Sequence, residues 1–227
     1  MSKIFCFLFF PLFAAAQPRL STPVPFAGYD FLNKSSVYSH SDTVEIGSCL
    51  FPKLAGPASI KLKNGRIYTD INAAINLMTN ELVFQDSTGQ MYTAIVEIDS
   101  VEFKQSEVCP ANTVFKTGFP KTDNFSERTF FEVLSEGKLA LLKAYKISYV
   151  DKTVLGTTAP VRQYDTKEIL YTYSKGKGIT KLSKSKDDVL SIMNDKNAEI
   201  SDYLKQHKVN FKSQADLSRL FGYYNSL

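Results

Sequence analysis

The sequence of 227 residues contains no tryptophan, only two histidines and only three cysteines. The two histidines, His40 and His207, lie far apart, so the chain has no spacing typical of a zinc site. His40 has serines on both sides and Asp42 nearby, but a serine triad is assembled from separate parts of a fold. We therefore expect a protein without a cofactor, a metal site or catalytic residues.

An excess of charge of one sign is also missing. The chain has 27 Lys and Arg residues against 23 Asp and Glu residues, which gives a formal net charge of +4. Nucleic-acid-binding proteins usually carry a clear basic stripe, and so small an excess does not indicate one. We expect no nucleic-acid partner.

Long apolar runs are absent except near the first residue. Ile4–Phe13 is apolar and broken only by Pro11, with Lys3 before it and Ala14–Ala16 after it. This order of positive charge, apolar core and small residues is typical of a secretory signal peptide. The run is shorter than the roughly 20 residues that a membrane span needs. We expect a signal peptide over residues 1–16, export to the periplasm or the extracellular space, and no transmembrane segment in the mature chain.

The few cysteines bear on the compartment. Cys6 lies inside the expected signal peptide and is lost with it, which leaves Cys49 and Cys109. Exported proteins tend to oxidise their thiols, so we predict a disulfide between Cys49 and Cys109. The alternative is two separately buried thiols, which behave as small apolar side chains.

Proline is concentrated in residues 17–58, which show no sustained period. We expect an irregular, proline-rich arm there, with one short strand at Thr43–Ile46. The pattern changes at Ser59, where apolar and polar residues begin to alternate. The expected domains are therefore the signal peptide, this arm, a β domain over residues 59–183 and C-terminal helices over residues 184–227.

The clearest local signal in the β domain is Asn64-Gly65 between two alternating runs. Both residues tolerate the positive φ of a type I′ turn, which is the commonest two-residue hairpin connection. This predicts a hairpin with Leu62 opposite Ile67 and Lys61 opposite Tyr68.

Further short alternating runs are separated by turn-forming residues. Together they predict an antiparallel meander, either a sandwich or a partly open barrel, in a mainly β (α+β) protein. The expected strands are 81–85, 91–98, 100–104, 113–117, 129–134, 139–149, 161–173 and 179–182.

After Ser183 the period of the apolar residues changes from two to about 3.6. Ser213 with Asp216 three residues later nearly matches a capping box, which predicts the start of a helix. The following apolar residues share one face, so this helix is expected to pack on the sheet. They are Leu217, Leu220, Phe221 and Tyr224.

Two groups of charged residues are candidate sites. Five lysines between residues 175 and 186 have no acid among them and are suited to an anionic surface such as lipid. The alternative is a solvated hairpin tip whose lysines protect an edge strand from pairing. These lysines are Lys175, Lys177, Lys181, Lys184 and Lys186.

The second group is Glu97, Asp99 and Glu102. Paired carboxylates serve glycosidases, and Glu97 and Asp99 would share one face of a strand. Nothing nearby supplies the apolar pocket that would divide their roles, so an exposed strand face is the favoured alternative.

Three stretches carry a resemblance: the Ser59–Asp70 hairpin, the Phe130–Lys143 block, and the ending Phe221–Leu227 (FGYYNSL). In this order, behind a signal peptide, they resemble a family of small exported proteins from Bacteroidetes-type bacteria that has no assigned function. The resemblance implies a bacterial envelope address and brings no catalytic residues.

Three hypotheses of function remain from the sequence. The leading one is a non-enzymatic exported envelope protein whose curved sheet binds an apolar small molecule or lipid. The second is a protein–protein interaction module of the envelope that uses the proline-rich arm or an exposed strand edge. The third, a glycan hydrolase, depends on the acidic group near Glu97.

Overall fold

The computed structural model describes residues 34–37, 44–86, 88–122, 124–153 and 160–227. The expected signal peptide and His40 lie outside these described residues. In the described part the chain forms one sheet followed by helices, in that order along the sequence. The mainly β architecture with C-terminal helices is therefore confirmed.

The sheet contains twelve strands and is open, with β1 at one end and β12 at the other. The order is β1-β6-β5-β4-β3-β7-β8-β9-β10-β11-β12, and these neighbours are antiparallel. β2 adds to β11 in a parallel sense. The strands are β1 (Lys34–Val37), β2 (Val44–Ile46), β3 (Leu50–Leu62), β4 (Ile67–Asn76), β5 (Glu81–Gln85), β6 (Met91–Ala94), β7 (Ile98–Phe103), β8 (Thr113–Lys116), β9 (Phe131–Ser135), β10 (Ala140–Lys152), β11 (Val161–Ser174) and β12 (Gly178–Lys181).

The sheet begins earlier than expected, because β3 starts at Leu50 inside the predicted proline-rich arm. Phe51 faces Ile75 of β4, and the next paired residue of β3 is Gly56, which faces Ala73. Pro52 falls in this irregular stretch, where its missing N–H removes no rung of the ladder. Proline in the sequence therefore marked a bulge rather than the absence of a strand.

The hairpin at Asn64-Gly65 forms, but its register is one residue away from the prediction. Lys61 faces Ile67 and Ile60 faces Tyr68. Gly65 alone takes a positive φ (85°), while the Asn64 side chain accepts a hydrogen bond from Arg66 N at 3.0 Å. This local bond favours a three-residue turn with a bulge over the type I′ turn. The one-residue difference turns Tyr68, not Ile67, into the core.

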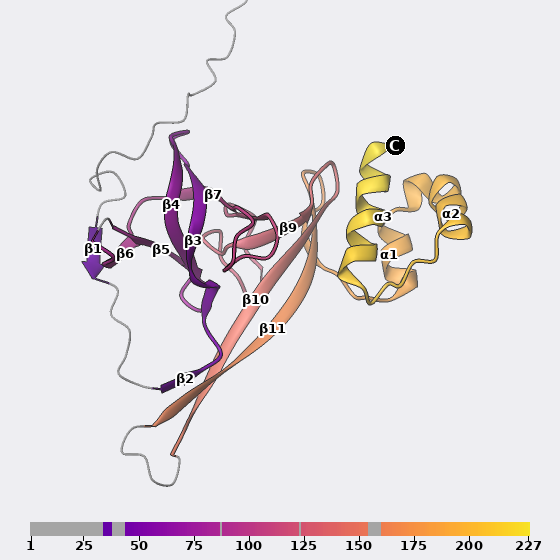
Figure 1. Ribbon diagram of the computed structural model, residues 1–227. Helices are drawn as coiled ribbons and strands as arrows, with labels where there is room; N and C mark the ends of the chain where they lie inside the picture. Colours follow the sequence, from indigo (N-terminus) through magenta and orange to yellow (C-terminus); the bar gives the residue numbers. More distant parts are fainter. Residues whose placement is uncertain (1–33, 38–43, 87, 123, 154–159) are drawn as a thin grey trace, which may run out of the picture.

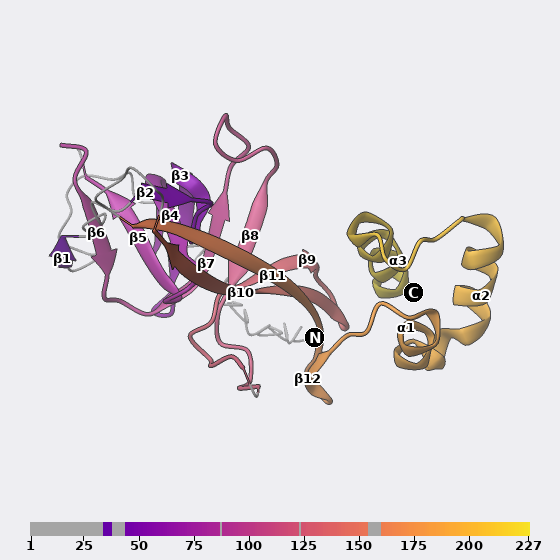
Figure 2. The same ribbon diagram turned by 90° about the horizontal axis from the view of Figure 1, so that it is seen from below.

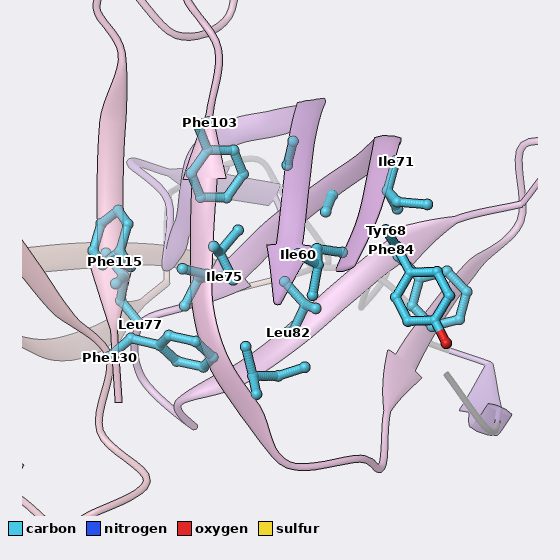
Figure 3. Packing of buried hydrophobic residues seen from close by; sticks show 14 of the residues in the cluster. Ile60, Tyr68, Ile71, Ile75, Leu77, Leu82, Phe84, Phe103, Phe115 and Phe130 are labelled. Carbon is cyan, nitrogen blue, oxygen red and sulfur yellow. The ribbon is translucent and has the colours of Figure 1, made fainter. Parts of the chain in front are cut away.

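The interior beside β3, β4 and β7 is filled by large apolar side chains (Figure 3). Phe84, Phe103 and Phe115 are each fully buried. Phe103 and Phe115 pack edge to face, with ring centroids 6.1 Å apart, and Phe115 continues to the ring of Tyr145 on β10 at 6.2 Å. This packing ties the first half of the sheet to the base of the long β10–β11 hairpin.

The helices are α1 (Lys186–Ile192), a 3₁₀ turn η2 (Asn194–Lys196), α2 (Asn197–Gln206) and α3 (Gln214–Ser226). Ser213 caps α3 by accepting a hydrogen bond from Asp216 N at 3.3 Å, as predicted. The predicted apolar stripe of α3 is buried against Leu139 of the β9–β10 turn, Leu141 of β10 and Leu170 of β11. The helices thus cover one end of the β10–β11 hairpin, and β3–β7 lie toward its other end (Figure 2).

Candidate functional site

The outer part of the β10–β11 hairpin is largely exposed, since every residue of β10 from Lys146 to Lys152 except Ile147 is exposed. β10 and β11 pair without interruption from Ala140–Tyr173 to Lys152–Val161. β9 covers the other edge of β10 only from Leu141 to Lys143. We call the outer half, Ala144–Lys152 with Val161–Ile169, the arm; it is distinct from the proline-rich arm predicted for residues 17–58. The arm reaches away from the helices toward β2 (Figure 1).

The backbone hydrogen bonds determine which groups of β10 lie on its open edge. Leu170 accepts a bond from Leu182 N on its β12 side, so Leu170 and its partner Lys143 form a non-hydrogen-bonded pair of the β10–β11 ladder. The alternation then directs the N–H and C=O groups of Tyr145, Ile147, Tyr149 and Asp151 away from β11. Among the described residues no strand pairs with this edge.

Side chains on one face of the arm hold its two strands together. Arg162 makes two bonds of 2.8 Å to the Asp151 carboxylate and lies 4.0 Å over the Tyr149 ring. Tyr149 packs edge to face on Tyr164 at 6.0 Å. The bond from Arg162 holds the pKa of Asp151 below its usual value. An isolated two-stranded ribbon is only marginally stable, and these contacts explain how the arm keeps its shape.

β2 occupies part of the opposite edge of the arm. Val44, Glu45 and Ile46 pair with β11 from Val161 to Gln163. Tyr164 Oη donates to Glu45 Oε1 at 2.9 Å. Partial burial, together with this bond, raises the pKa of Tyr164. The arm therefore already accepts one added strand, from its own chain, on the edge formed by β11.

Apolar side chains are exposed on and beside the arm. Tyr149 and Val150 of β10 are 44% and 60% exposed. Val44 and Ile46 of β2 are 59% and 56% exposed. Single exposed apolar residues are ordinary, but Tyr149 and Val150 lie on the strand with the unpaired edge, and such a combination is typical of an interaction site.

A buried ionic cluster lies at the base of the arm. Lys143 Nζ lies 2.9 Å from Glu132 Oε2 and 3.1 Å from Gln214 Oε1 of α3. The Tyr145 hydroxyl also donates to Glu132 Oε2, and burial, reinforced by the charge of Glu132, raises the pKa of Tyr145. Each charged group has a partner, so the cluster joins sheet and helix rather than offering a reactive group.

The sequence indicates the strands of the arm but not their role. It predicted strands at 139–149 and 161–173, close to β10 and β11. The sequence does not show that β10 extends beyond the residues that pair with β9, because the length of a neighbouring strand is a property of the fold. One signal for an exposed strand was available: polar residues are so frequent in Lys146–Lys152 that this stretch has no continuous apolar face to bury.

The five candidate lysines are brought together only loosely. Lys175 and Lys177 lie in the β11–β12 turn, Lys181 in β12, and Lys184 and Lys186 at the start of α1; each is exposed. No ion pair among the described residues includes them. Because β12 is the last strand of the sheet, this placement agrees with lysines that protect an edge strand.

The predicted disulfide between Cys49 and Cys109 is wrong: both thiols are buried and neither is bonded to the other. The Cys49 carbonyl accepts a bond from Leu77 N, beside the β4–β5 turn. Cys109 lies in the loop after β7, and its thiol donates to Ala111 O at 3.1 Å. Cys49 directly precedes β3, whereas the loop that contains Cys109 lies beside Gly56 farther along the same strand, so the two residues stand at different positions along β3.

The acidic group is separated by the fold. Glu97 precedes β7 rather than lying within a strand, and Asp99 is neutralised by Lys61 at 3.1 Å and Lys63 at 3.6 Å. Glu102 is exposed farther along β7. The three residues therefore do not form one carboxylate site.

A pocket of about 950 Å³ lies between the β4–β5 turn, the β6–β7 connection and the β8–β9 loop. Its charged lining residues have both signs, and polar side chains such as Thr79 and Asn80 lie between them. The charged residues are Lys63, Glu81, Glu97, Glu127 and Arg128. Such a lining is not suited to an apolar ligand.

Among the described residues, no group of three or more His, Cys, Asp or Glu side chains is placed to hold a metal ion. No described helix combines the length and the apolar character needed to cross a membrane.

Comparison with known proteins found no matching family model, no significant match among curated proteins and no significant match among solved structures.

Proposed function

We propose that this chain is an exported, non-enzymatic interaction module of the cell envelope, and that its contact is the open edge of β10 on the arm. The observation that carries the proposal is the run from Lys146 to Lys152, which is paired on one side only among the described residues and is exposed except at Ile147. An extended segment added to such an edge gains main-chain hydrogen bonds without refolding the protein that receives it.

The rigidity of the arm supports this role. A docking strand that was disordered before binding would lose conformational entropy on binding, which weakens affinity. The Asp151–Arg162 pair and the Tyr149–Tyr164 contact hold the receiving edge in its paired geometry beforehand. The exposed Tyr149 and Val150 then supply apolar area next to the backbone bonds.

An apolar-ligand carrier, the leading hypothesis from the sequence, has weaker support. A carrier needs an empty apolar cavity, whereas Phe84, Phe103 and Phe115 fill the interior beside β3 and β4 (Figure 3). The pocket near Asn80 is lined with charge. Native mass spectrometry of the purified protein separates the two: we expect the mass of the polypeptide alone, and a co-purified lipid would favour the carrier.

The interaction role is tested by photo-crosslinking in cells that produce the full chain. A photoreactive amino acid at Tyr149 should give a covalent adduct heavier than the chain. The matched control is Thr166, which is exposed on the neighbouring strand of the same arm but away from the open edge of β10. The proposal fails if Tyr149 gives no adduct, or if Thr166 gives the same adduct with equal yield.

A further inference from the structure

We infer that the pocket beside the β4–β5 turn binds a short zwitterionic peptide, whose ammonium group contacts Glu97 and Glu127 and whose carboxylate contacts Arg128. This inference goes beyond the proposed interaction role of the arm and does not depend on it. It assigns a second site to the chain, together with the chemical class of its ligand.

The β8–β9 loop forms one wall of the pocket, and hydrogen bonds at both ends of this wall hold it in place. Gly118 N donates to Glu127 O at 2.7 Å. Phe130 N donates to Asn80 Oδ1 at 3.1 Å, which ties the loop to the β4–β5 turn. Arg128 lies between these two bonded residues of the loop. The wall is therefore formed before a ligand arrives, and a preformed site loses less conformational entropy on binding.

The charged side chains around the pocket differ in whether they already have a partner. Lys63 and Glu81 each have one, an aspartate at 3.6 Å and a threonine hydroxyl at 2.7 Å. The side chains of Glu97, Glu127 and Arg128 form no ion pair and no hydrogen bond with the part of the chain that the structure describes. Two unpaired carboxylates and one unpaired guanidinium group therefore border one concave site.

The two carboxylates come from segments that meet at Lys63. Lys63 N donates to Glu97 O at 3.0 Å. The Lys63 ammonium group lies beside Gly118, which is itself bonded to Glu127 O. Glu97 and Glu127 thus border the same end of the pocket, and Arg128 lies one residue farther along the loop.

Below the charged rim the pocket has an apolar floor and further polar groups. The floor consists of the buried residues Leu82, Ile98 and Phe130, of which Leu82 and Phe130 are labelled in Figure 3. Thr93 is only 9% exposed, and its hydroxyl makes no hydrogen bond to any described residue. The Asn80 side chain uses its oxygen for Phe130, and its amino group keeps the capacity to donate. An apolar floor with a few polar groups of fixed position is typical of small-molecule sites.

The lining also disfavours other classes of ligand. Nucleotides stack their bases on aromatic rings, and the only aromatic residue in the lining, Phe130, is buried. Three glutamates against one lysine and one arginine do not favour an anionic ligand such as a phosphate. A neutral sugar would leave the unpaired charges of both signs without partners.

The size of the pocket favours a peptide over a single amino acid. The volume of about 950 Å³ is near the upper end of the roughly 300–1,000 Å³ of pockets that enclose drug-sized ligands. One amino acid would leave most of this space empty. A peptide of a few residues fills more of it and still carries one ammonium group and one carboxylate.

Trialanine is a suitable probe, because its ends carry charge and its side chains do not. Titration calorimetry of the full chain should show binding of trialanine. N-acetylation or C-terminal amidation removes one charge, and each should raise the dissociation constant at least about tenfold. Alanine alone should also bind at least about tenfold more weakly. A dissociation constant above about 10 mM for trialanine overturns the inference.

Variants assign the two ends of the peptide to their contacts. Arg128→Gln should weaken trialanine binding at least about tenfold and should remove the effect of C-terminal amidation. Glu97→Gln combined with Glu127→Gln should do the same for N-acetylation. A merely structural role would weaken binding of every form of the peptide equally. The matched controls are Arg66→Gln and Glu102→Gln, which make the same charge changes at exposed residues outside the lining.

Each other outcome contradicts the inference. Equal binding of the free and the end-blocked peptides refutes a zwitterionic ligand. Equal binding of alanine and trialanine refutes a peptide. Binding that survives Arg128→Gln, or that the controls weaken as much, places the contact elsewhere. None of these results bears on the arm, because crosslinking at Tyr149 concerns residues that do not line the pocket.

Discussion

Glu132 and Lys143 face each other on β9 and β10, with the ammonium nitrogen 2.9 Å from a carboxylate oxygen and both side chains largely buried. The pair lies at the last residue of β10 that pairs with β9, which is the point where the arm begins. Gln214 adds a bond from the first residue of α3. One cluster therefore joins the sheet, the helices and the base of the arm.

Removal of one partner of this pair should be costly. Lys143→Met leaves the Glu132 carboxylate buried without its cation, and we expect a loss of about 3–5 kcal/mol in the free energy of unfolding. The double variant Glu132→Gln with Lys143→Met should recover part of that loss. Chemical denaturation measures both. Lys104→Met, which breaks an exposed pair with Asp70, is the control and should have a much smaller effect; equal losses would contradict a buried pair.

Gly137 should not tolerate a methyl group. It lies in the β9–β10 turn, where an added Cβ would meet the amide of Asn225 from α3. That amide accepts from Leu139 N at 3.0 Å and donates to Leu139 O at 2.9 Å. We expect Gly137→Ala to lower the free energy of unfolding by about 1–3 kcal/mol. Gly176→Ala, in the open β11–β12 turn with no atom within 4 Å, should change it by less than about 0.5 kcal/mol.

Asp216 should make stability depend on pH in the acid range. Its carboxylate accepts a bond from Asn210 N at 2.8 Å, and this bond is the main reason that its pKa lies below the usual 3.8. The stabilisation is therefore present above pH 3.8 and is lost as the pH falls through the lower folded pKa. Asp216→Asn should unfold at lower denaturant than the wild type at pH 6, and the difference should shrink toward pH 2. A constant difference across this range would contradict the assignment.

The buried thiols predict how the protein responds to a reductant. A bond between Cys49 and Cys109 would close a long loop and contribute about 4 kcal/mol in the chain-entropy model. Its reduction would then lower Tm by roughly 10 °C. Because neither cysteine is in a disulfide, we expect Tm to be the same with and without reductant, and both thiols to react with a thiol reagent after unfolding. A large fall of Tm in reductant would show a disulfide.

The sequence by itself determined the local structure. Alternating apolar residues predicted most strands of the sheet, Ser213 predicted the start of α3, and the stripe from Leu217 to Tyr224 predicted its buried face. These features depend on residues that are close in the sequence, through capping bonds and the period of apolar side chains. They can therefore be predicted from the sequence alone.

Only the tertiary structure decided the separation of Cys49 from Cys109 and the open edge of the arm. Each depends on where one strand ends relative to another that is distant in the sequence. β10 has an open edge because β9 pairs with it only as far as Lys143, and residues 144–152 do not specify where β9 ends. Pairing between strands is a nonlocal contact, and the sequence of one strand does not specify the length of its neighbour.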